Sequence, residues 1–313
     1  MDLESLNILH EICTINGIHY DNLLNDNFLN QSLIILFTNF KKCISLHNFP
    51  YLTELIIISQ DITQITKLET CPNLKKLWLC ECKLNKIENL TSCKQLNELY
   101  LYDNFIKKIE NLSNNQQIEC LWLNNNQISV IEGLNNLKQL KQLNLSGNYI
   151  NNLNNNLLYN QKLEIFSISG NYLWNPNDIS ILSKLPCLTT LNINEPEYLK
   201  NPLCYHSNLP ILLIYRLPQL CKIDHININL IDLKYAIKSI IQELQMFGYL
   251  EIQEINNTDD VFTYCNVLLN SRLCNHDMNN SIVNSLKLLH LYKINNRLLL
   301  QRIIFILKAE NIV

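Results

Sequence analysis

Apolar residues recur along the middle of this chain with a period of 22 residues. Each unit reads L-x-x-L-x-L-x-x-N-x-I-x-x-I-x-x-L, as in residues 96–112. The regular units begin at Leu52, Leu74, Leu96, Ile118 and Leu140, and two looser units begin at Leu163 and Leu188. Such a unit cannot bury its apolar side alone, so the pattern predicts a stack of units around one continuous core.

The first part of each unit alternates in the way that is typical of a short β-strand. Positions four and six, such as Leu99 and Leu101, are apolar and are expected to point into the core, whereas positions three, five and seven point outward. The equal spacing places these strands side by side in a parallel sheet. Position nine predicts a ladder of side chains that hydrogen-bond the loop backbone, formed by Gln60, Cys82, Asn104, Asn126, Asn148 and Asn171.

The second part of each unit, such as Ile106 to Leu112, has room for only a turn or two of 3₁₀ or α helix. The sequence therefore predicts an α/β solenoid with parallel strands on its concave face and short helical turns on its convex face. The pattern is lost in the last unit at Asn194-Glu195-Pro196.

Both ends of the stack are expected to be capped. Residues 1–50 predict an N-terminal helix and a degenerate capping repeat, residues 51–200 the repeats, and residues 201–226 a C-terminal cap. Residues 227–313 predict a helical tail that packs on itself, docks on the solenoid or binds a partner, and a helical core is the favoured interpretation.

The outward positions carry the candidate binding residues. Trp78, Tyr100 and Trp122 occupy position five of successive units, so we expect one aromatic stripe with Tyr102 beside it. These rings either stabilise the scaffold or anchor a protein partner within a polar rim, and binding is the favoured interpretation. The predicted partner-binding set is Glu54, Ile56, Lys76, Trp78, Glu81, Glu98, Tyr100, Tyr102, Asp103, Trp122, Asn124 and Asn144.

Composition narrows the function classes. A net charge of -3 disfavours direct binding to nucleic acid. The start of the chain does not resemble a secretory signal and no apolar run is long enough to span a membrane, so we expect a soluble intracellular protein that is a monomer. The twelve cysteines then predict buried free thiols, with Cys82 in the ladder and Cys80 pointing outward.

Signatures of catalysis and of ligand binding are missing from the sequence. It contains no Walker loop, G-x-G-x-x-G, H-E-x-x-H or G-x-S-x-G motif, so we expect neither an enzyme nor a cofactor. A candidate metal cluster at Cys265, Cys274, His276 and Asp277 lacks paired C-x-x-C spacing, so no metal site is predicted.

The segments Ile87-Glu88-Asn89-Leu90, Ile109-Glu110-Asn111-Leu112 and Ile131-Glu132-Gly133-Leu134 resemble those of intracellular leucine-rich repeat proteins with 22-residue repeats, the class of protein phosphatase 1 regulatory subunit 7. The resemblance covers roughly residues 30–235 and implies a leucine-rich repeat horseshoe. Residues 217–224 resemble the C-terminal cap of such proteins, which implies that Asp224 seals the last edge.

This resemblance also implies a function. The class consists of non-catalytic scaffolds and adaptors, so it implies a protein partner on the concave face. The partner classes that it implies are an axonemal protein in a cilium or flagellum, the phosphatase 1 catalytic subunit, and the protein part of a ribonucleoprotein. A cytoplasmic or ciliary location follows, with the nucleus as the alternative.

Overall fold

The computed structural model of the chain describes residues 3–18, 31–36, 46, 49–66, 68–176, 178–205, 209, 213, 217 and 219–227. The chain divides into two compact units. Residues 1–203 and 222–225 form the first unit, and residues 204–221 and 226–313 form the second. The repeats and the predicted binding residues all lie in the first unit.

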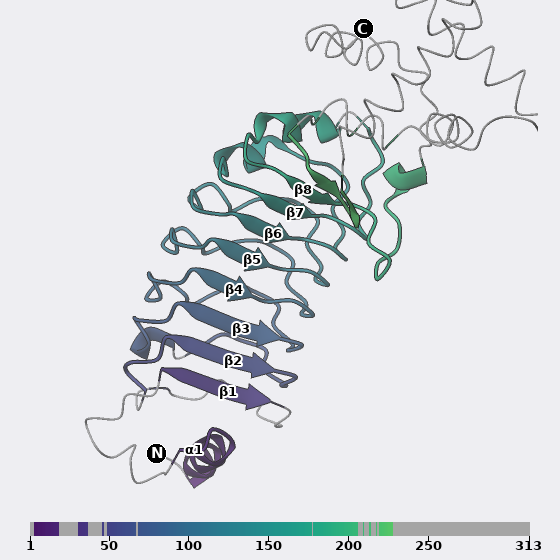
Figure 1. Cartoon of the computed structure of the whole chain (residues 1–313). Coiled ribbons are helices and arrows are strands. Elements are labelled where there is room, and N and C mark those ends of the chain that lie inside the picture. The colour runs from purple at the N-terminus through teal and green to yellow at the C-terminus, as the bar shows by residue number, and fades with distance from the viewer. Residues whose placement is uncertain are drawn as a thin grey trace, which may run out of the picture. The chain divides into compact units, whose positions relative to one another are not determined.

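A parallel sheet runs the length of the first unit, and its strands follow each other in chain order (Figure 1). Each neighbouring pair has a parallel register, so equivalent positions of successive repeats lie opposite each other. The strands are β1 (Ser32–Leu36), β2 (Glu54–Ile58), β3 (Lys76–Cys80), β4 (Glu98–Tyr100), β5 (Cys120–Trp122), β6 (Gln142–Asn144), β7 (Ile165–Ser167), β8 (Thr190–Asn192) and β9 (Lys222–Ile223). In the second unit, the described strand is β10 (Ile226–Asn227).

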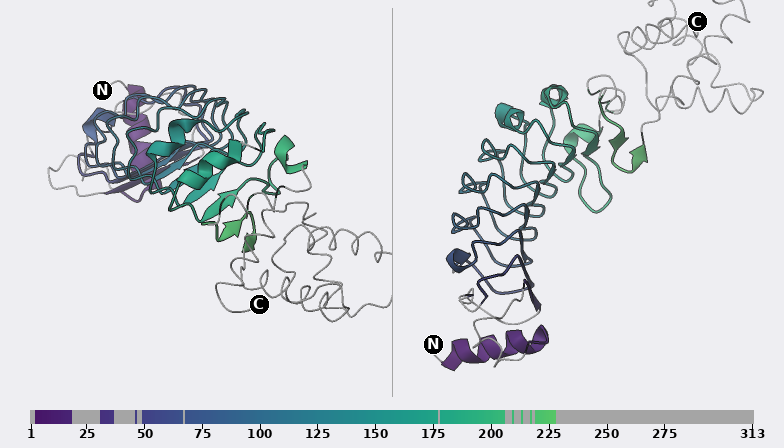
Figure 2. Two further views of the ribbon diagram at one scale, coloured as in Figure 1. Left: turned by 90° about the horizontal axis from the view of Figure 1, so that it is seen from above. Right: turned by 60° about the vertical axis from the view of Figure 1, so that its left-hand side comes forward.

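Short helical turns follow the strands on the opposite side of the stack (Figure 2). They are 3₁₀ helices: η2 (Leu68–Thr70), η3 (Asn155–Tyr159), η4 (Asp178–Lys184) and η5 (Pro202–Tyr205). In the connection that follows β4, a side chain bonds to the neighbouring repeat: Asn111 Nδ2 donates to Ile87 O of the preceding repeat at 2.7 Å. The predicted solenoid with strands on one face and short turns on the other is confirmed.

The asparagine ladder lies inside the stack as predicted. Asn126 Oδ1 accepts from Ile106 N at 2.9 Å, and its Nδ2 donates to Leu101 O at 2.9 Å and Leu123 O at 3.1 Å. Each rung thus pairs backbone groups of two repeats that would otherwise be buried without partners. Cys82 takes the same place with a weaker bond, from its thiol to Cys80 O at 3.3 Å.

Helix α1 (Leu3–Ile15) covers the N-terminal end of the stack, where it contacts β1 (Figure 2). Its apolar side buries Leu9, Ile12 and Cys13. Beyond the helix, Asn16 pairs with the outer edge of β1: its Nδ2 donates to Ile34 O at 2.8 Å, and its Oδ1 accepts from Ile34 N at 2.8 Å. One side chain thereby takes the place of a neighbouring strand.

The last repeat differs from the prediction that its pattern is lost. The ladder resumes at Asn201, which is fully buried and donates to Ile168 O at 3.0 Å and Ile193 O at 2.9 Å. The intervening residues 194–200, called the strap, are an insertion within an otherwise regular repeat. Asp224 Oδ1 accepts from Ile193 N at 2.7 Å and Asn194 N at 2.9 Å, and so holds the base of the strap.

Residues 228–313, which include most of the predicted helical tail and the candidate metal cluster, lie outside the described residues. The domain boundaries drawn from the sequence stay predictions. Throughout the described part of the chain, no helix has the length and apolar character needed to cross a bilayer.

Candidate functional site

Position five of the strands carries a row of half-buried side chains. Ile56, Trp78, Tyr100, Trp122 and Asn144 stand in register across β2 to β6. The ring centroids of Trp78 and Tyr100 lie 4.1 Å apart, and those of Tyr100 and Trp122 lie 5.4 Å apart. We call Trp78, Tyr100, Trp122 and Tyr102 the aromatic stripe, and its predicted continuity is confirmed.

Tyr102 extends the stripe sideways. Its ring meets that of Trp78 edge-on, with centroids 6.4 Å apart. Beneath it, Cys80 is fully buried and donates from its thiol to Tyr100 O at 3.3 Å. The structure therefore corrects the expected exposure of Cys80, and not the side of the strand on which its thiol lies. Strand alternation turns the thiol to the concave side as expected, but burial by the neighbouring aromatic repeats raises its pKa to about 12.

Charged groups border the stripe and are fixed by hydrogen bonds. Glu98 accepts from Tyr100 OH at 2.9 Å and forms an ion pair with Lys76 Nζ at 2.9 Å. Burial raises the pKa of Tyr100, and its contact with Cys120 adds to the shift, so the hydroxyl stays protonated and can donate. The stripe and its acidic border are consequently held in place before any partner arrives.

Three further carboxylates of the predicted set have partners from the neighbouring repeat. Glu54 accepts from Ser32 Oγ at 2.8 Å and Glu81 from Ser59 Oγ at 2.6 Å. Asp103 accepts from Asn125 Nδ2 at 2.8 Å. None of these three donors carries a charge, so the negative charge of this border is retained.

The strap covers the outward side of the later repeats. Asn124 Nδ2 donates to Tyr198 OH at 3.3 Å, Ser146 Oγ donates to Glu195 Oε2 at 3.3 Å, and Glu195 N donates to Ser169 Oγ at 3.1 Å. Asn124 is only 9% exposed as a result. The sequence placed this residue on the open face, and that placement is wrong because an insertion far along the chain folds back over it.

Sequence reasoning missed Tyr198 and Glu195 as neighbours of the site. Two glycines in the sequence, Gly147 and Gly170, indicate that another segment lies close to the backbone there. Position eight has positive φ in each of six successive repeats, at Ser59, Glu81, Asp103, Asn125, Gly147 and Gly170. Four of these repeats use a residue with a side chain, so the backbone alone does not require glycine. Gly170 is needed because a Cβ there would lie 2.7 Å from Tyr198 Cβ, and a Cβ at Gly147 would clash with Asn125 Oδ1 and lie 3.0 Å from the Tyr198 ring.

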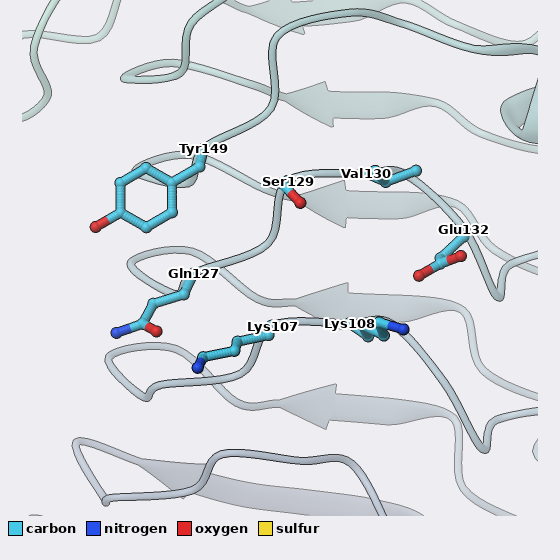
Figure 3. Close-up of a pocket in the computed structure, with 7 residues that line it drawn as sticks. All are labelled: Lys107, Lys108, Gln127, Ser129, Val130, Glu132 and Tyr149. Atoms are coloured by element: carbon cyan, nitrogen blue, oxygen red, sulfur yellow. The ribbon is translucent and has the colours of Figure 1, made fainter.

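A shallow depression lies on the half of the repeats that follows the strands (Figure 3). Lys107, Gln127 and Tyr149 line one side of it, and Lys108, Val130 and Glu132 line the other. Its volume is about 300 Å³. None of its lining residues belongs to the aromatic stripe, so this depression is a separate feature.

The described residues contain no group of three or more His, Cys, Asp or Glu side chains arranged to hold a metal ion. The described cysteines are free thiols, of which Cys13, Cys71, Cys80, Cys82, Cys93 and Cys120 are buried.

A family model described as leucine-rich repeats in two copies matches residues 72–114 and 116–158. These segments are leucine-rich repeats. The matched residues include β3 to β6 and all four members of the aromatic stripe, so the candidate site is built on leucine-rich repeat strands.

Two solved structures are similar to this chain. Internalin C2 of Listeria monocytogenes is 19% identical in sequence, and the match covers 69% of this chain and 90% of that chain with a TM-score of 0.52. A leucine-rich repeat protein of Leptospira interrogans is 26% identical, over 58% of this chain and 52% of that chain, with a TM-score of 0.48. The likeness to internalin C2 shows the fold, which is a leucine-rich repeat solenoid.

Proposed function

We propose that this leucine-rich repeat chain is a non-catalytic scaffold that binds a protein partner through the aromatic stripe and its carboxylate border. The observation that carries the proposal is the stripe itself: rings from three adjacent strands contact each other and stay half-exposed. Aromatic side chains in a polar rim are the usual energetic centre of a protein interface.

Preorganisation supports the same conclusion. Each ring is already held by its neighbour, and Tyr100 is also held by Glu98, so binding would order few side chains and lose little entropy. The competing interpretation is that the rings only stabilise the sheet, as cross-strand aromatic pairs do by up to about 1 kcal/mol.

A comparison of tryptophan variants separates the two interpretations. We expect Trp78→Ala and Trp122→Ala each to weaken partner binding by about 2 kcal/mol, or roughly 30-fold, because a buried anchor is lost at the interface. Trp174→Ala is the matched control, since Trp174 is 64% exposed and lies outside the stripe.

The partner would first be captured with the tagged full chain and identified by mass spectrometry, and its affinity for each variant would then be measured by calorimetry. Urea unfolding of each variant gives the fraction folded. If both stripe variants kept the parental affinity while remaining folded, the rings would be structural and the proposal would be wrong.

The resemblance of the repeats to the protein phosphatase 1 regulatory subunit 7 class, and within it to leucine-rich repeat-containing protein nine, narrows the partner. We propose an axonemal protein first, in the cytoplasm or a cilium. The phosphatase 1 catalytic subunit and the protein part of a ribonucleoprotein, the latter in the nucleus, are the alternatives. The identity of the captured partner decides among the three.

A further inference from the structure

The strap crosses three repeats and is fitted to each of them. It forms hydrogen bonds with position seven of three successive repeats: it accepts from Asn124 and Ser146 and donates to Ser169. In the earlier repeats the same position holds Ile58, Cys80 and Tyr102. The residues that lie under the strap are therefore amide or small hydroxyl side chains, which hydrogen-bond to it.

Glycine usage shows the same fit. The chain has only five glycines, and two of them, Gly147 and Gly170, lie against Tyr198 of the strap. A side chain at Gly170 would push the strap away from the sheet, and a side chain at Gly147 would meet both Asn125 and the Tyr198 ring. The base of the strap is pinned by Asp224, and Tyr198 N donates to Glu195 O at 3.2 Å within it. These contacts make the strap a fixed wall of the concave face.

The wall limits the space that a partner can occupy. From β2 to β5 the position-five side chains are half-buried and open to contact, whereas from the repeat of β5 onward position seven is closed by the strap. Three strand spacings separate β2 from β5, which is about 14 Å. An α-helix of about ten residues has this length.

A helix suits this face better than an extended segment does. The stripe runs across the strands, and the backbone groups of interior strands are already paired within the sheet. An extended segment lying on the rings would leave its own N–H and C=O groups unpaired, whereas a helix satisfies them internally.

Charge sets the direction of that helix. Glu195, Asp103 and Glu197 act electrostatically on Tyr198, whose hydroxyl accepts a hydrogen bond at 3.3 Å from Asn124, two residues after Trp122 of the stripe. Within the described residues, the ion pairs of lysine involve other carboxylates, namely Glu98, Asp61 and Glu119. A helix N-terminus carries partial positive charge and is stabilised by nearby carboxylates.

We propose that the strap is the end stop of the partner-binding face: the partner lays one helix of about ten residues along the aromatic stripe, with its N-terminal end against Tyr198. This inference rests on the proposed function, because it names the element that the stripe binds. It adds Tyr198 to the residues that touch the partner.

Photocross-linking from both ends of the stripe tests the proposal. Benzoylphenylalanine would replace Ile56 in one full-length variant and Tyr198 in another, with replacement of Tyr172, which is exposed away from the stripe, as the control. We expect the Ile56 and Tyr198 probes to cross-link the same partner, within one helix, with the Tyr198 product nearer to the helix N-terminus.

The outcomes separate the two proposals. Cross-linking from Ile56 but not from Tyr198 would overturn the end stop and leave the proposed function standing. Cross-linking from neither position would overturn both. Products in the reverse order along the partner helix, or in a segment without helical structure, would overturn the proposed orientation or the proposed element.

A second variant displaces the strap while leaving the sequences of the strap and of the aromatic stripe unchanged. Gly170→Ala places a Cβ 2.7 Å from Tyr198 Cβ, and we expect it to weaken partner binding about tenfold. Gly17→Ala is the control, because Gly17 also has a positive φ and a Cβ there would meet nothing within 4 Å. Tyr198→Ala serves if Gly170→Ala does not fold. Unchanged affinity in a folded variant would contradict the proposal.

Discussion

Asn126 illustrates how one side chain joins two repeats. Its amide is buried and bonds to backbone atoms of Ile106, Leu101 and Leu123. We expect Asn126→Ala to lower the free energy of unfolding by about 3 kcal/mol, because buried N–H and C=O groups lose their partners. Urea unfolding measures the change. Asn85→Ala is the control, because Asn85 is exposed in the repeat that begins at Leu74. It should change the free energy of unfolding by less than about 0.5 kcal/mol.

The residues of the stripe could be predicted from the sequence, because strand alternation fixes which side chains point outward. Trp78, Tyr100 and Trp122 needed only their spacing of 22 residues. The burial of Asn124 could not be predicted in this way. It depends on Tyr198, which lies 74 residues later and has no place in the repeat formula.

At the scale of the element, Asn16 protects the open edge of the sheet. An edge strand offers unpaired backbone groups to other chains, and proteins commonly block such edges. Asn16→Ala frees N and O of Ile34, so we expect the variant to self-associate and to lose about 1 kcal/mol of stability. Light scattering against concentration measures the association. Thr14→Ala, an exposed change in α1, should stay as dispersed as the parent.

The strap shows where element-level prediction reached its limit. Asn194-Glu195-Pro196 breaks the formula, and this break predicts that the pattern is lost. The ladder in fact continues at Asn201, because an insertion between positions seven and nine leaves the flanking strands β8 and β9 in register. A search for a delayed asparagine would have found the rung, and the glycines at positions 147 and 170 would have indicated what lies over it.

At the scale of the whole molecule, buried thiols link stability to pH. Burial raises the pKa of Cys80 and of Cys93 to about 12 from a usual value of 9.0. Above pH 9 the unfolded chain loses these protons while the folded chain keeps them, so the free energy of unfolding falls as pH rises toward 12. We expect a loss of about 1 kcal/mol per thiol at pH 10.

Urea unfolding at pH 7.5 and pH 10 tests this dependence. Serine does not titrate in this range, so the double variant Cys80→Ser and Cys93→Ser should lose less stability between the two pH values than the parent does. Equal losses in the parent and the double variant would show that these thiols do not cause the alkaline destabilisation.

Because the strap closes one end of the concave face, the number of repeats determines the length of the open part. Its base is fixed at the end of β8 and its reach ends at Asn124, so the length of open sheet equals the number of repeats that precede that residue. Adding one 22-residue unit between β3 and β4 would lengthen the open face by one strand spacing, about 4.8 Å, without altering either end. Under the proposed function, the number of repeats before Asn124 would set the length of the partner segment that the open face can hold.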